Sequence, residues 1–174
     1  MTKDQFLRDV SGWNNHLPLL WLGLEDTQHN KHPVIEFGSG LGSTPILKQY
    51  CKDAGREFLS YDNNAEWAEQ MGSILIPNWS TAEIYKRSSV ILVDCAPGES
   101  RHEIMAIMKD RADIIIVHDT EKDGSGNYLY EKIWPLFKFR INLTGGSTWA
   151  SAVSNTIDLS IFVGNEFGQY KVTS

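Results

Sequence analysis

The sequence contains few cysteines, no long apolar run and no cluster of basic residues. Only Cys51 and Cys95 occur among 174 residues, and no CxxC pair is present. Two cysteines are too few for a disulfide scaffold, so we expect both to be reduced, with Cys95 packed at the end of a buried strand. No apolar stretch approaches the ~20 residues that a membrane-spanning helix needs. These absences exclude a disulfide-rich domain and a membrane-spanning chain.

The sign of the net charge disfavours nucleic acid as a partner. The 22 acidic side chains outnumber the 16 lysines and arginines, which gives a formal net charge of -6. An acidic chain has no general attraction for a phosphate backbone, so we predict that the protein binds neither nucleic acid nor a membrane. The N-terminal stretch MTKDQFLRDV is polar and charged, unlike a signal peptide, which favours a cytoplasmic location. The sequence does not indicate an oligomeric state.

Apolar runs alternate with helical patterns, as in a mostly parallel sheet covered on both faces. We therefore predict an α/β fold, a three-layer α-β-α sandwich with a mostly parallel seven-stranded sheet and an antiparallel C-terminal strand. One domain is expected over residues 1–174, with an N-terminal helical cap at 1–32 and the core at 33–174. A mobile lid is expected at 121–127 and a helix at 128–134. Strands are expected at residues 33–37, 57–61, 73–76, 89–93 and 113–117, then from 136 onward, including 157–161.

The strongest single signal is a glycine-rich turn between a predicted strand and a predicted helix. Gly38, Gly40 and Gly42 alternate directly after the strand, and Glu36 precedes the first glycine by two residues. Glycine serves where the backbone turns sharply or where a ligand approaches the chain closely. At the carboxyl end of a parallel strand, such a turn forms the floor of a site for a nucleotide-like ligand. The carboxylate of Glu36 favours a cationic ligand and would repel a pyrophosphate.

Polar and aromatic side chains also follow the second and third predicted strands. Asp62 lies about twenty residues beyond the glycines, where an acid can accept hydrogen bonds from both hydroxyls of a ribose. Capping of the next helix is the alternative role for Asp62, and Asn63 or Asn64 can serve as that cap equally well. Trp79 is expected either in the core or against an adenine base.

Two later strand ends carry polar clusters. Asp94 follows one all-apolar strand, and His118, Asp119 and Thr120 follow the next. We expect these groups to meet in one cleft, because the carboxyl ends of parallel strands open at the same edge of a sheet. The two carboxylates and the hydroxyl suit either acid–base chemistry or a divalent cation held by Asp94 and Asp119. Arg101 is either a solvated helix residue or a clamp for an anionic group of the substrate.

The glycine turn resembles motif I of class I S-adenosylmethionine-dependent methyltransferases, (E/D)xGxGxG. A nicotinamide oxidoreductase would instead carry GxGxxG, usually without the preceding acid. The resemblance implies a Rossmann-like fold and S-adenosylmethionine as cofactor. In many members the segment before the first strand folds over the cofactor, a role that suits Asn15 and His16, although a simple helix break at Pro18 is the alternative. The implied cofactor contacts are Glu36, Gly38, Ser39, Gly40, Gly42, Ser43, Asp62, Asn63, Trp79 and His16.

The two strand-end clusters are similar to those of O-methyltransferases, which carry an Asp after the fourth strand and (H/D)D(T/N/V) after the fifth. Catechol-type enzymes hold magnesium with such acids, and macrolide-sugar methyltransferases have a comparable HDT. The run VDCAPGESR followed by ADIIIVHDT also resembles plant glucuronoxylan O-methyltransferases. Thr120 departs from the catechol-type pattern, which has Asn there.

This second resemblance implies an O-methyltransferase that acts on a hydroxyl, of a sugar or another glycan. It implies Asp94, His118 and Asp119 as catalytic residues, Asp94 and Asp119 as ligands of a divalent cation, and Arg101 as a substrate-binding residue. The expected partner is a small-molecule or glycan acceptor. A methyltransferase with a phenolic or other acceptor and a non-catalytic S-adenosylmethionine-binding protein are the alternatives.

Overall fold

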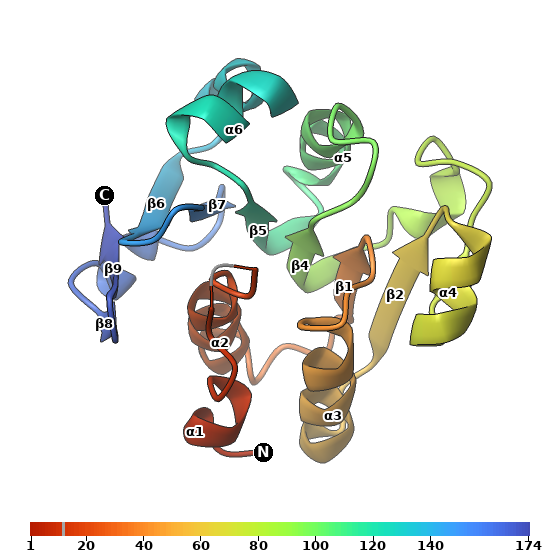
Figure 1. Ribbon diagram of the computed structural model, residues 1–174, viewed down its shortest axis with the longest axis horizontal. Helices are drawn as coiled ribbons and strands as arrows, with labels where there is room; N and C mark the ends of the chain where they lie inside the picture. The colour runs from red at the N-terminus through yellow and green to blue at the C-terminus, as the bar shows by residue number, and fades with distance from the viewer. Residues whose placement is uncertain (12) are drawn as a thin grey trace.

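The computed structural model describes residues 1–11 and 13–174 and contains one mixed sheet (Figure 1). Within these residues the sheet has nine strands in the order β3-β2-β1-β4-β5-β7-β6-β9-β8. The strands from β3 to β5 pair in parallel, and the remaining four pair antiparallel. The bounds are β1 Val34–Phe37, β2 Phe58–Asp62, β3 Ile74–Leu75, β4 Ser88–Val93, β5 Ala112–His118, β6 Phe139–Thr144, β7 Ala150–Ser154, β8 Glu166–Phe167 and β9 Tyr170–Thr173.

Helices lie on both faces of the sheet, with α2 and α3 on one side and α5 and α6 on the other (Figure 1). The α-helices are α1 Lys3–Phe6, α2 Leu17–Asp26, α3 Thr44–Ala54, α4 Ala65–Met71, α5 Ser100–Met108 and α6 Lys122–Tyr128. Four 3-10 helices, named η, are η1 Ala82–Ile84, η2 Tyr130–Lys132, η3 Trp134–Leu136 and η4 Leu159–Phe162.

The core has two halves because side chains of the central strands alternate between the faces of the sheet. One half contains Val34 with residues of α2 and α3, and the other contains its neighbour Ile35 with residues of α5 and η2. β4 and β5 are buried along their whole length, as expected for strands in the middle of a covered parallel sheet. The carboxyl ends of β1, β4 and β5 therefore lie together on a rigid base.

The helices after β1 and β2 have well-defined ends. α3 has Pro45 in its first turn and ends at Gly55, and α4 begins with the Asn64 side chain accepting from the backbone N–H of Trp67 and ends at Gly72. Both terminal glycines have left-handed backbone angles, a conformation that glycine adopts without steric cost. The N-terminal ends of α3 and α4 lie beside the edge of the sheet where β1 and β2 finish.

The α/β class is confirmed, but several details of the prediction are wrong. The sheet has nine strands rather than seven, because β8 and β9 form a short hairpin beside β6. Residues 159–162 form η4 rather than a strand, and the expected lid at 121–127 is mostly the helix α6. The helix expected at 128–134 is divided between the end of α6 and η2. No helix in the described ranges is long and apolar enough to cross a membrane.

Candidate functional site

The three glycines of the turn after β1 have different neighbours. Gly38 has φ +91°, and a Cβ there would lie 2.5 Å from the Cα of Cys95, so glycine is required where the chain passes the loop after β4. A Cβ at Gly42 would overlap the side chain of Asn14. Within the described part of the chain, a Cβ at Gly40 would meet one side-chain atom, at the ordinary distance of 3.5 Å. Gly40 lines a cavity, so its missing side chain leaves room for a ligand.

Glu36 is fully buried beneath this turn and is bonded to it. Its carboxylate accepts hydrogen bonds from the hydroxyls of Ser43 at 2.5 Å, Thr44 at 2.7 Å and Ser60 at 2.6 Å. Burial raises the pKa of Glu36 to about 7, and the hydrogen bonds from Ser43, Ser60 and Thr44 lower it by a smaller amount. Glu36 therefore ties the start of α3 and the middle of β2 to β1, and its oxygens are occupied by protein hydroxyls.

Two cavities lie on either side of the turn. The first has a volume of about 590 Å³ and is lined by residues of the N-terminal segment, including His16, and by residues of the turn, including Gly40 and Ser43. The second has a volume of about 370 Å³ and is lined by Gly38, Ser39, Asp62, Asn63, Asn64, Glu66, Trp67, Gln70, Asp94 and Ala96. Asp94 lines both cavities, so the two meet at the end of β4.

Asp62 faces the second cavity and also holds the turn. Its Oδ2 accepts from the N–H of Ser39 at 2.9 Å and from the Ser39 hydroxyl at 3.0 Å, and its Oδ1 accepts from the N–H of Asn64 at 2.9 Å. An ionised carboxylate offers about four acceptor positions. About one position is left for a ligand, whereas the sequence-based expectation was bonds from both hydroxyls of a ribose. The helix cap is Asn64.

Two tryptophans of this region have roles that the sequence did not distinguish. Trp67, which sequence reasoning missed, lines the second cavity and donates from Nε1 to the carbonyl of Ser39 at 2.5 Å. Trp79 is 6% exposed, packs edge-on against Phe37 and donates to the carbonyl of Ala96 at 2.8 Å. Trp79 is absent from the described lining of both cavities, so its position agrees with packing in the core and not with contact to an adenine base. The sequence signal that could have identified Trp67 is a tryptophan in the first turn of the helix after Asp62, but no motif marks that position.

The structure brings together the three predicted catalytic residues. Nδ1 of His118 lies 3.5 Å from Oδ2 of Asp94 and 3.4 Å from Oδ1 of Asp119. His118 is 3% exposed, and its Nε2 has no hydrogen-bond partner in the part of the chain that the structure describes. Burial lowers the pKa of His118, but the hydrogen bond and charge of Asp94 and the charge of Asp119 outweigh burial and raise it overall.

The backbone of Asp119 has φ 56°, which is uncommon outside glycine. Such conformations cost free energy and persist where the surrounding structure holds them. Asp119 is held by ion pairs with both His118 and Arg101. The strained position therefore points the carboxylate into the cluster.

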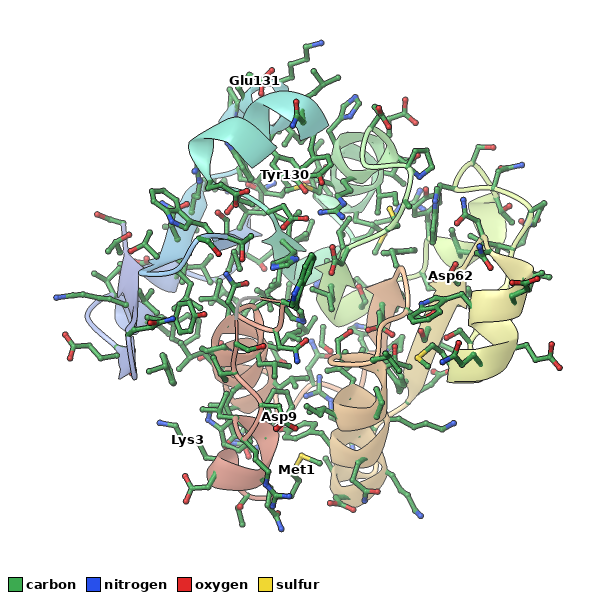
Figure 2. All side chains as sticks on the ribbon, in the orientation of Figure 1. Met1, Lys3, Asp9, Asp62, Tyr130 and Glu131 are labelled. Atoms are coloured by element: carbon green, nitrogen blue, oxygen red, sulfur yellow. The ribbon has the colours of Figure 1, made fainter. Side chains whose placement is uncertain are left out.

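Arg101 is buried, so it is not the solvated helix residue that was one of its two expected roles. Its Nη2 lies 2.8 Å from Oδ1 of Asp94, and its Nη1 lies 3.1 Å from Oδ2 of Asp119. Nε donates to the carbonyl of Cys95 at 2.9 Å. The guanidinium lies 4.4 Å from the centre of the Tyr128 ring. Every guanidinium nitrogen thus has a protein partner, and Arg101 joins the loops after β4 and β5. Figure 2 shows Asp62 near α4 and Tyr130 near α5 and α6.

The N-terminal segment reaches the same edge of the sheet. Nδ2 of Asn15 donates to the carbonyl and hydroxyl of Thr148 at 2.5 and 3.0 Å. The ring of His16 lies 5.0 Å from that of His118, and neither nitrogen of His16 has a hydrogen-bond partner among the described residues. Burial, followed by the neighbouring His118, lowers the pKa of His16 to about 3. His16 is therefore a neutral imidazole in the wall of the first cavity.

The cluster does not fit a magnesium ion between Asp94 and Asp119. The guanidinium of Arg101 already bridges these carboxylates, so a cation there would meet a fixed positive charge at close range. Thr120 is buried, and its hydroxyl accepts from Ser151 at 2.8 Å.

A different set of possible metal ligands lies next to this pair. One ligand atom each of His16, Asp94 and His118 lies within 4.8 Å of the other two. Two imidazoles with one carboxylate suit a transition metal better than magnesium. Arg101 adjoins this set as well, because it is paired with Asp94, and its charge opposes a cation there.

Family models and curated proteins give no match to this chain, whereas solved structures do. A SAM-dependent O-methyltransferase from Thermotoga maritima is similar with a TM-score of 0.58 and 10% sequence identity, covering 79% of this chain and 64% of that chain. The hMettl16 catalytic domain in complex with MAT2A 3'UTR hairpin 1 has a TM-score of 0.56 and 12% identity, covering 85% and 71%.

A third similar structure is the MycE methyltransferase of the mycinamycin biosynthetic pathway, in complex with Mg and SAH. It has a TM-score of 0.52 and 11% identity, and the similarity covers 80% of this chain and 49% of that chain. Identities this low show the fold alone. The chain therefore has the fold of the S-adenosylmethionine-dependent methyltransferases.

The buried position of Glu36 predicts a dependence of stability on pH. Native Glu36 keeps its proton up to about pH 7, whereas the unfolded side chain loses it near 4.5. Between these values the native protein binds more protons than the unfolded chain, so the free energy of unfolding falls as pH rises. The expected loss attributable to Glu36 is about 3 kcal/mol across this window.

Denaturant unfolding at several pH values between 4.5 and 7 measures this loss. Glu36→Gln should reduce the fall in stability, since the amide does not titrate, while the exposed Glu131→Gln should behave as the wild type. Equal pH slopes in the wild type and in Glu36→Gln would contradict the prediction.

Proposed function

We propose that this protein is an S-adenosylmethionine-dependent O-methyltransferase that acts on a hydroxyl of a sugar or another glycan. One observation carries the proposal. The two cavities beside the glycine turn share Asp94, and the buried His118 lies directly behind that carboxylate, with Nε2 unpartnered among residues 1–11 and 13–174 and outside the described lining of both cavities. A place for a ligand of two parts therefore lies next to Asp94, and a group that can accept a proton, His118, lies next to the same carboxylate. The shared fold with methyltransferases supports the choice of cofactor.

The residues around the turn fit the cofactor in both shape and charge. Asp62 and Trp67 suit the ribose and adenine in the second cavity, and Gly40 and His16 suit the methionine part in the first. With His118 neutral, the carboxylates of Asp94 and Asp119 and the guanidinium of Arg101 leave one net negative charge where the cavities meet. That charge complements a sulfonium cation.

The cluster at the ends of β4 and β5 is suited to removing a proton from a hydroxyl. Nδ1 of His118 faces Asp94 and Asp119, so this nitrogen carries the proton in the neutral ring and Nε2 keeps its lone pair. Nε2 is buried, so the step requires the acceptor to enter beside Asp94 and contact this nitrogen; Nε2 then accepts the hydroxyl proton as the new bond to carbon forms, and the two carboxylates stabilise the imidazolium. The cofactor supplies the methyl group on a sulfonium, which is a good leaving group.

The features that favour an oxygen acceptor are the base and the sequence of the loop after β4. A hydroxyl of high pKa needs a base, whereas an amine needs less help to lose its proton. Many amine-methylating enzymes carry an (N/D)PPY-type loop at this place, and here the chain reads Asp94-Cys95-Ala96-Pro97-Gly98. The resemblance to sugar O-methyltransferases is the ground for a glycan.

An RNA acceptor is the second candidate. The hMettl16 domain, which has the same fold, is in complex with MAT2A 3'UTR hairpin 1. The net charge of -6 opposes RNA binding over the whole surface but does not exclude a local contact. Acceptor assays distinguish these two candidates.

The first prediction concerns the cofactor. Gly40→Val should weaken binding of S-adenosylmethionine strongly while the protein stays folded, because the side chain extends into the cavity and not into the protein. Asp62→Ala should weaken it by about 10- to 100-fold, the loss expected for one charge-assisted hydrogen bond. Isothermal titration calorimetry measures both, with Gly126→Val as control, since no atom of the described residues lies within 4 Å of a Cβ at Gly126. Preference for NAD over S-adenosylmethionine would disprove the cofactor assignment.

The second prediction concerns the base. A raised pKa keeps His118 protonated to a higher pH than an ordinary histidine, so the transfer rate should rise with pH through a midpoint above 6.5. Asp119→Asn removes one charge that raises this pKa, so the midpoint should move to lower pH.

His118→Ala should lower the rate by about 10²- to 10⁴-fold, the usual contribution of a general base, while cofactor binding and a cooperative melt persist. The exposed His32→Ala is the matched control. A pH profile that is the same in the wild type and in Asp119→Asn would argue against His118 as the base.

The third prediction identifies the acceptor. Labelled methyl groups should pass from S-adenosylmethionine to sugar hydroxyls in preference to phenols, peptides and RNA, when all four are offered under identical conditions. Incorporation into RNA or peptide amines, with none into sugars, would overturn the sugar as the proposed acceptor, while the proposal of a methyltransferase would stand. Binding of the cofactor without transfer to any acceptor would favour the non-catalytic alternative.

A further inference from the structure

The buried Arg101 occupies the place between two carboxylates where the sequence predicts a divalent cation. Its Nη2 pairs with Oδ1 of Asp94, and its Nη1 pairs with Oδ2 of Asp119. The other oxygen of each carboxylate, Oδ2 of Asp94 and Oδ1 of Asp119, lies 3.5 and 3.4 Å from Nδ1 of His118. Each carboxylate therefore gives one oxygen to the guanidinium and one to the imidazole.

We propose that Arg101 is a positioning residue that replaces the metal ion, holding Asp94 and Asp119 against His118 so that methyl transfer proceeds without a bound cation. The proposal rests on the proposed function, because the reaction that it describes is the proton removal by His118. It goes beyond that function in assigning the source of positive charge and in excluding a role for a metal between Asp94 and Asp119.

The surroundings of Arg101 fix the direction of the guanidinium. Nε donates to the carbonyl of Cys95, and Nη1 also donates to the carbonyl of His118 at 3.3 Å. The hydroxyl of Tyr130 donates to the same His118 carbonyl at 3.0 Å, and the ring of Tyr128 covers the guanidinium face at 4.4 Å. A planar group held at its edge and at its face keeps both carboxylates in place before any ligand arrives.

A guanidinium suits this position better than an ammonium or a hydrated ion. Its planar fork can bond two carboxylates from different nitrogens at the same time, whereas lysine offers a single charged atom. The site is also enclosed, since the side chain of Arg101 is only 8% exposed and those of Asp94 and Asp119 are 27% and 21% exposed. A cation that bound both acids would have to displace Arg101 from its partners on two loops.

The first experiment measures methyl transfer by the wild type before and after treatment with a chelator. The rate should change by less than about twofold, because the charge near the acids belongs to the chain. Loss of transfer on chelation, restored by magnesium or another divalent ion, would overturn the proposal while leaving the methyltransferase function in place. Absence of S-adenosylmethionine binding and of any transfer would instead refute the function itself.

The second experiment replaces Arg101 and tests chemical rescue. Arg101→Ala should lower kcat by about 100-fold, with cofactor binding retained, because His118 loses the alignment of its carboxylates. Added guanidinium ion should restore part of the rate, whereas urea, which has a similar shape and no charge, should not. Arg87→Ala is the matched control, since Arg87 pairs with Asp113 at the opposite end of β5.

Two results of the second experiment would overturn the proposal. The first is a folded Arg101→Ala protein with the wild-type rate. The second is an Arg101→Ala protein whose rate is restored by a divalent ion, or is restored by neither guanidinium nor urea. Arg101→Lys decides the matter if the alanine variant fails to fold. It keeps the charge but lacks the fork, so its kcat should fall by about tenfold while the affinity for the cofactor is unchanged. A wild-type kcat in Arg101→Lys would show that bridging is not needed.

Discussion

The close approach of two loops, at Gly38 and Cys95, is the constraint on which the rest of the site depends. A side chain at position 38 would lie within 2.6 Å of backbone atoms of residues 94 and 95. Because the glycine turn and the loop after β4 touch here, Asp94 stands beside the turn and lines both cavities. A looser approach would separate the proposed cofactor site from the proposed base. Gly38 is required by this backbone contact, whereas Gly40 lines the first cavity.

Buried charge on both sides of this contact is balanced in two different ways. Moving an unpaired carboxylate out of water costs several kcal/mol. Glu36 reduces that cost by holding a proton up to about pH 7 and by accepting three hydroxyl hydrogen bonds. Burial raises the pKa of Asp94, but the hydrogen bond and charge of His118 and then the charge of Arg101 lower it overall, and Arg101 pairs with Asp119 as well. The first arrangement ties down the glycine turn between the two cavities, and the second leaves a net negative charge where the proposed cationic cofactor would lie.

The parts of the fold predicted from sequence are those set by uninterrupted local patterns. The strands that became β4 and β5 are all-apolar runs, and parallel ends must share an edge, so the meeting of Asp94 with His118 followed. The direction of Arg101 did not follow, because it depends on the rotation of α5 about its axis and on contacts with other loops. Residues 157–161 alternate like a strand, yet Leu159 and Phe162 are buried while Ile161 is 60% exposed. A spacing of three residues with an Asp158 cap belongs to a 3-10 helix.

The unequal surroundings of the two neighbouring imidazoles assign them different roles. The rings of His16 and His118 lie 5.0 Å apart, so two charged rings would repel strongly in this buried place. Asp94 and Asp119 both lie within ion-pair distance of His118, whereas burial and His118 itself lower the pKa of His16 to about 3. A proton that enters this pair therefore resides on His118. His16 stays neutral, so in the proposed function the N-terminal segment contributes an uncharged wall of the first cavity while β5 contributes the proposed base.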